Sequence, residues 1–199
     1  AFLLVVFAFV AISVLLSVIF PGIFRINSAN YSPFFAFGTS SIFVTIFFIA
    51  ESFFGWEGAT YLAEETQDPE KVIPKAILIG TIIVGFLGTL IAVVSLGVIP
   101  WRILATSSAP LAIVSEQLLG NIGMKIINFG IFVALIGSAA GGIITMPRLI
   151  LALARDKLFI AQFSSIHEKF QTPYKAIIFQ TIVSLVIFGM AFGKYKLLL

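Results

Sequence analysis

Long apolar runs are the feature that most limits what this chain can fold into. A membrane-spanning α-helix needs ~20 consecutive apolar residues, and the chain contains five runs of about that length or more. They cover residues 1–24, 34–63, 76–99, 122–154 and 174–193. Only 11% of the residues are charged, against about 25% in soluble domains. The sequence therefore predicts an all-α integral membrane protein, with five transmembrane helices in a single membrane domain over residues 1–199.

The second run, residues 34–63, is longer than one span needs and is not uniformly apolar. It contains the acidic residues Glu51 and Glu57 and, close to them, Gly55 and Gly58. Carboxylates are costly inside a bilayer and usually mark functional sites, and glycine permits backbone conformations that interrupt a helix. We therefore expect a broken helix here, whose freed backbone groups can hold a bound molecule. The alternative is that these are ordinary glycines of a membrane helix.

Basic residues in the connections predict how the chain is oriented. The loops after the second and fourth runs fall on one side of a five-span arrangement and carry seven of the twelve Lys and Arg residues. These are Lys71, Lys75, Arg148, Arg155, Lys157, Lys169 and Lys175. By the positive-inside rule those two loops are cytoplasmic, and the loops after the first and third runs are external.

Two connections have the pattern of short helices on the membrane surface. Residues 106–120 begin with serines before Pro110 and end at Gly120, which are common start and stop signals. Residues 156–170 place large apolar side chains at helical spacing among charged ones. We expect a helix in each segment.

The fourth run carries small residues and, near its end, an arginine. Glycines recur on roughly one face, at Gly130, Gly137 and Gly141. Such a stripe lets another helix approach closely, so these residues are predicted to pack helices together. Arg148 is expected to pair with an acidic residue of the predicted cytoplasmic loop, where Glu64, Glu65 and Asp68 lie. It would then serve as an anchor or, alternatively, as part of a gate.

Composition also excludes several kinds of site. The chain has no cysteine and a single histidine, His167, so disulfides and thiolate or histidine zinc sites are excluded. The net charge of +3 is spread between the apolar runs, which does not indicate nucleic-acid binding. No nucleophile with a nearby base is evident. We expect neither an enzyme nor a metal or cofactor site.

The polar loop after the second run resembles the sixth-helix signature of amino acid permeases, in the amino acid–polyamine–organocation superfamily. It reads Gly55-Trp56-Glu57, then Tyr61-Leu62-Ala63-Glu64-Glu65-Thr66-Gln67-Asp68-Pro69-Glu70-Lys71-Val72-Ile73-Pro74-Lys75-Ala76-Ile77. Later segments resemble the eighth helix, the loop after it and the entry to the ninth, at Pro147-Arg148, Ala154-Arg155-Asp156 and Thr172-Pro173-Tyr174. The resemblance implies a leucine-transporter-like inverted-repeat bundle, of which this chain is a fragment covering roughly helices five to nine. The remaining helices of the full-length protein are then its partners.

The same resemblance implies which residues meet the substrate. They lie around the helix break, at Phe53, Phe54, Gly55, Trp56, Glu57 and Gly58. Glu57 could carry a coupling proton, or it could cap the start of a half-helix, where a carboxylate is favoured. Glu51 could select cationic substrates or carry a proton, or it could simply face a water-filled vestibule.

The function implied is secondary active transport of amino acids by a multi-pass protein of the cell membrane, either proton-coupled or by exchange. Sodium-coupled relatives use paired hydroxyls on the eighth helix. Here Ser138 is followed by Ala139, which favours protons or exchange. The chain would hold only part of the substrate site, and its partners would be an amino acid and the lipid bilayer. Alternatives are a transporter of polyamines or cationic amino acids, or a non-transporting membrane subunit or channel.

Overall fold

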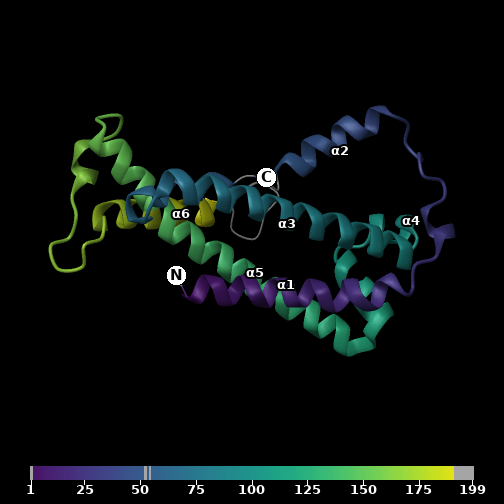
Figure 1. Cartoon of the computed structure of the whole chain (residues 1–199). Helices are drawn as coiled ribbons and strands as arrows, with labels where there is room; N and C mark the ends of the chain where they lie inside the picture. Colours follow the sequence, from purple (N-terminus) through teal and green to yellow (C-terminus); the bar gives the residue numbers. More distant parts are fainter. Residues whose placement is uncertain (1, 52, 54, 191–199) are drawn as a thin grey trace. The chain divides into compact units, whose positions relative to one another are not determined.

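A computed structural model describes residues 2–51, 53 and 55–190 of the chain, and in this part the secondary structure is entirely helical (Figure 1). The α-helices are α1 (Phe2–Ile23), α2 (Ser40–Glu51), α3 (Pro69–Val98), α4 (Trp101–Thr106), α5 (Pro110–Arg155) and α6 (Tyr174–Met190). Short or irregular 3₁₀-helices connect them: η1 (Ser28–Tyr31), η2 (Trp56–Glu65) and η3 (Ala161–Ser164). The chain forms two compact units, which we describe separately. One comprises Ala1–Trp56 and Pro74–Ala139, and the other Glu57–Ile73 and Ala140–Leu199.

Three helices of the described part, α1, α3 and α5, are long and apolar enough to cross a membrane. Large apolar side chains cover their surfaces and remain exposed, among them Phe9, Phe86 and Phe132. Soluble proteins rarely expose so much contiguous apolar surface. The predicted all-helical membrane fold is therefore confirmed. The count of five spans stays a prediction, because α2 has 12 residues and α6 has 17 among the described residues.

The first unit is held by a small core at the ends of α1 and α3 and the beginning of α5. Val18, Ile99, Ala112, Val114 and Ile127 form this buried cluster. α1 runs alongside the first part of α5 (Figure 1). Because closely packed side chains leave no room for added atoms, residue size matters where α1 meets α5.

The sequence predicts a short helix that ends at Gly120, and the structure has a kink there, inside the longer helix α5. Its backbone there has φ 67°, a left-handed conformation that glycine adopts without steric cost. The expected start before Pro110 and end at Gly120 are both present, and the chain continues directly into the long apolar part of the helix. Sharp kinks arise where the regular hydrogen-bond ladder is interrupted in this way.

The second unit includes the end of α5, η3 and α6. Phe159 and Phe163 stack on each other and on Phe179 of α6, with ring centroids 5.0–6.0 Å apart. The prediction of an amphipathic helix over residues 156–170 is wrong. Only η3 is helical in that segment, and Lys157 has a positive φ of 61° that ends the helical path. The aromatic residues at helical spacing are used instead to pack a folded loop on α6.

Candidate functional site

The second apolar run is interrupted where the sequence predicts. α2 ends at Glu51, and the amide of Phe53 donates to the Ala50 carbonyl at 3.0 Å as the last turn closes. Gly55 then has φ 100°, a region that side chains other than glycine rarely occupy. The chain resumes as η2, a 3₁₀-helix of 10 residues. Runs of 3₁₀-helix longer than 3–4 residues are uncommon and often mark a hinge or strain.

Two aromatic residues flank the interruption in the first unit. The rings of Phe53 and Trp56 lie 6.3 Å apart. A methyl group added to Gly80 of α3 would lie 3.0 Å from Cζ3 of Trp56. The absence of a side chain at Gly80 therefore makes room for the indole on the surface of α3.

The residues that follow lie in the second unit. Glu57 is exposed, and its carbonyl accepts a hydrogen bond of 2.6 Å from the Thr60 hydroxyl. Gly58 is buried, and a Cβ there would lie 3.5 Å from the hydroxyl of Thr145 in α5. The side chain of Glu51 and the whole of Phe54 lie outside the described part of the chain. The roles assigned to all these residues stay predictions.

Arg148 makes the acidic pairing that the sequence predicts. Its Nε and Nη2 donate to the two carboxylate oxygens of Glu65, at 2.5 and 2.9 Å. Its Nη1 also donates to the Ile144 carbonyl one turn earlier in α5. A second pair joins Arg155 Nη1 to Glu64 Oε2 at 2.7 Å. The sequence analysis missed this second pair. The only hint of this pair in the sequence is that two adjacent acids, Glu64 and Glu65, and two arginines, Arg148 and Arg155, are predicted to lie on the same side of the membrane.

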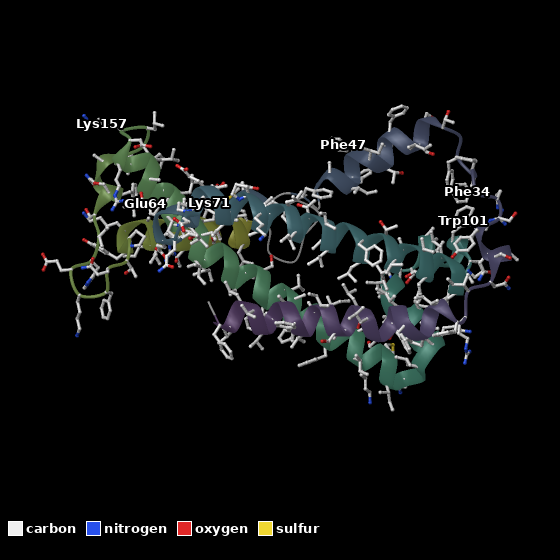
Figure 2. All side chains as sticks on the ribbon, viewed as in Figure 1. Phe34, Phe47, Glu64, Lys71, Trp101 and Lys157 are labelled. Atoms are coloured by element: carbon white, nitrogen blue, oxygen red, sulfur yellow. The ribbon has the colours of Figure 1, made fainter. Side chains whose placement is uncertain are left out.

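Both ion pairs line one cavity of ≈ 310 Å³ in the second unit. Thr60 and Tyr61 of η2 line its wall together with Gln171 from the loop before α6. Figure 2 shows Glu64 among side chains that carry nitrogen and oxygen atoms. The arrangement places hydrogen-bonding groups and both signs of charge around one small space.

Another cavity, of ≈ 480 Å³, lies in the first unit, and five of its thirteen lining residues are aromatic. Phe34 and Trp101, which lie near each other in Figure 2, contribute to its lining. Next to it, the loop before α2 is tied to the end of α3. Asn30 Nδ2 donates to the Gly97 carbonyl at 2.7 Å and the Tyr31 hydroxyl donates to the Val93 carbonyl at 2.8 Å. These contacts also escaped the sequence analysis, since nothing local encodes them.

The predicted glycine stripe of α5 differs along its length. A Cβ at Gly130 would overlap the Val14 side chain of α1, and one at Gly137 would lie 2.9 Å from Cβ of Phe7. Among the described residues, a Cβ added at Gly141 would have nothing from its surroundings within 4 Å, so this position is open. The first two glycines thus sit where α1 and α5 approach closely.

Comparison with known proteins connects these features to one family. The family model described as amino acid permease matches residues 1–199. The vacuolar cationic amino acid transporter 4 of Arabidopsis thaliana is 32% identical over 151 residues, which is 74% of this chain and 24% of that protein.

Two proteins of Bacillus subtilis strain 168 are also similar. The branched-chain amino acid permease BcaP is 27% identical, over 74% of this chain and 32% of its own length. The serine/threonine exchanger SteT is 30% identical, over 74% of this chain and 33% of its own length. The chain thus spans a quarter to a third of these relatives. No solved structure matches it significantly.

Proposed function

Because this chain belongs to the amino acid permease family, we propose that the whole protein is a secondary active transporter of amino acids, working by proton coupling or by exchange. The chain supplies one part of the substrate site, and the rest of the transporter supplies the other. The relatives support the class of substrate, since their names include a cationic amino acid transporter, a branched-chain amino acid permease and a serine/threonine exchanger.

The observation that carries this proposal is the backbone interruption at Gly55, with φ 100°, between α2 and η2. In a bilayer, backbone groups outside regular structure are tolerated only where they are buried in protein or line a cavity. The last carbonyls of a helix bear partial negative charge. Those at the end of α2 therefore suit the α-ammonium group that amino acids share. In this proposal Phe53, Phe54, Gly55, Trp56, Glu57 and Gly58 form this part of the substrate site.

The two acidic residues near the interruption have separate proposed roles. Glu57 is exposed beside the interruption, so it can exchange a proton or cap the start of η2. Glu51 ends α2 and adds negative charge on the other side of the break. A second acid there favours substrates with a cationic side chain. This residue and the cationic transporter among the relatives support the second candidate, transport of cationic amino acids or polyamines.

The proposed location is the cell membrane. Transport requires the lipid bilayer and the remaining helices of the permease. Since one of the relatives is named as vacuolar, the location of the tagged full-length protein should be determined by microscopy. Labelling of an internal membrane in place of the cell surface would contradict this part of the proposal.

Uptake by the purified full-length protein in proteoliposomes tests the function. Radiolabelled leucine, serine, lysine and putrescine are offered separately, with and without an inward proton gradient, and with empty or amino-acid-loaded vesicles. Uptake that needs the gradient indicates proton coupling, whereas uptake that needs internal amino acid indicates exchange. Preference for lysine or putrescine supports the second candidate. Absence of uptake of every substrate contradicts a transporter and favours a non-transporting subunit.

A further inference from the structure

We propose that Arg148 is a positioning residue, which holds the second half of the interrupted run, η2, on α5 and thereby sets the rate of the transport step. The effect on transport rests on the proposed function, whereas the contact between Arg148 and Glu65 is independent of it. Arg148 lies far from Gly55 in the sequence and belongs to none of the residues assigned to the substrate site. Its role would be exerted through η2, to which it is joined by way of Glu65.

The geometry fixes the guanidinium group of Arg148 from two directions. Nε and Nη2 donate to the two oxygens of Glu65 in parallel, at 2.5 and 2.9 Å. Such fork-to-fork pairs add geometric specificity to their energy. The third nitrogen of the group, Nη1, donates to the Ile144 carbonyl, so the side chain is also anchored to its own helix. Together these bonds define one position for Glu65 relative to α5.

The neighbouring pair is built differently. Arg155 uses a single nitrogen on a single oxygen of Glu64, at 2.7 Å. The side chains are 41% and 65% exposed, against 24% and 58% for Arg148 and Glu65. Exposed ion pairs with one contact contribute little, because water and salt screen them. Arg155 is therefore a matched comparison on the same helix, two turns further along.

η2 depends on outside contacts for its position. A 3₁₀-helix has poorer hydrogen-bond geometry than an α-helix, and this one packs on α5 through Gly58 at Thr145 and through Glu65 at Arg148. The cavity of ≈ 310 Å³ beside these contacts leaves room for η2 to move. Weakening the Arg148 contact should release η2 at the Glu65 end while the Gly58 end stays packed.

Thiol labelling measures this release directly. A cysteine is introduced by Ala63→Cys, at a partly covered position of the cavity wall, in the full-length protein with any other cysteines replaced. Arg148→Lys, which keeps the charge but loses the fork, should raise the labelling rate about tenfold, the factor that corresponds to about 1.4 kcal/mol. Arg155→Lys should change it less than about threefold.

Two further variants protect the test against simple misfolding. Glu65→Gln removes the acidic partner and should raise labelling as Arg148→Lys does. The double variant Arg148→Glu with Glu65→Arg reverses the charges and should bring labelling back toward the wild-type rate. Equal labelling in wild type, Arg148→Lys and Glu65→Gln would overturn the positioning role.

Uptake separates this inference from the proposed function. Arg148→Lys should lower the maximal rate about tenfold and leave the KM unchanged, because the substrate meets the break at Gly55 and not Arg148. Arg155→Lys should leave both close to wild type. If the wild-type protein transports no amino acid, the proposed function fails and the labelling comparison still decides the role of Arg148. If the wild-type protein transports an amino acid and Arg148→Lys has the same maximal rate, the inference about Arg148 fails while the proposed function stands.

Discussion

Gly97 shows how a single residue position can fix the loop that precedes the interrupted run. Its carbonyl accepts from the Asn30 side chain at 2.7 Å and from the Asn27 amide at 2.9 Å. Its missing side chain leaves space for the Tyr31 hydroxyl group. The last carbonyls of a helix lack partners within it, and here the loop supplies them. Residues more than 60 positions apart are thereby joined at the end of α3.

Gly97→Ala should therefore destabilise the protein. The added methyl group would lie 2.5 Å from the Tyr31 hydroxyl oxygen and 3.0 Å from Ile26, so Tyr31 must move and lose its bond to Val93. Overpacking of this kind costs about 1–3 kcal/mol. Thermal unfolding of the full-length protein in detergent measures the loss. Gly88→Ala is the control, since nothing lies within 4 Å of a Cβ added at Gly88. Equal unfolding temperatures for both variants would contradict this role of Gly97.

Glu57→Gln tests whether this carboxylate carries the coupling proton. Glutamine keeps the shape of the side chain but cannot titrate, so uptake should lose its dependence on pH while exchange of bound substrate continues. Rates of both processes are measured in proteoliposomes over a range of pH. Glu64→Gln provides the control, because Glu64 is exposed and paired with Arg155. A pH dependence that survives Glu57→Gln would place the coupling proton elsewhere.

Glu51→Gln tests selection of the substrate side chain. If Glu51 faces a cationic group, its removal takes away one charge-assisted hydrogen bond, worth about 1.5–3 kcal/mol. Lysine affinity should then fall roughly tenfold or more while leucine affinity stays the same. Competition of each amino acid against labelled substrate gives the two affinities. A similar loss for lysine and leucine would mean that Glu51 has a structural role.

At the scale of elements, the break between α2 and η2 depends on one backbone conformation. With φ 100°, Gly55 occupies a region where a Cβ costs roughly 1–2 kcal/mol. Gly55→Ala should therefore shift the position of the break and lower the rate of uptake. The rate is measured in proteoliposomes. Gly85→Ala in α3 is the matched control, because nothing lies within 4 Å of a Cβ added at Gly85. Equal uptake by the two variants would show that the break tolerates a side chain.

The elements that sequence predicts well are those specified by local residues. Glycine and an overlong apolar run predict the break near Gly55, and Pro110 and Gly120 bound a helical segment in α5. Helical spacing failed over residues 156–170 because aromatic side chains at that spacing can equally pack a loop onto α6. Side-chain bonds to distant carbonyls, such as Tyr31 to Val93, have no local pattern. Pairing of Arg148 with an acid was predictable from charge, whereas its fork geometry was not.

At the scale of the whole molecule, the exposed apolar surface is the dominant fact. Phe2, Phe47 and Met190 are at least three-quarters exposed. Surfaces of this kind must be covered by lipid or by other membrane helices, because exposing apolar surface to water costs about 25 cal/mol per Å². The surface thus fits a chain embedded in a membrane.

The direction of the spans is predicted from charge and can be tested in the full-length protein in intact cells. Gln67 lies in the loop after the second apolar run, which is predicted to be cytoplasmic, and Ser108 lies in the loop after the third, which is predicted to be external. Both residues are exposed in the structure, so local burial should not limit their reactivity. With other cysteines replaced, Ser108→Cys should react with a membrane-impermeant thiol reagent added outside. Gln67→Cys should react only after the cells are permeabilised. The reverse pattern would invert the orientation, and reaction at both positions before permeabilisation would mean that residues 76–99 do not cross the membrane.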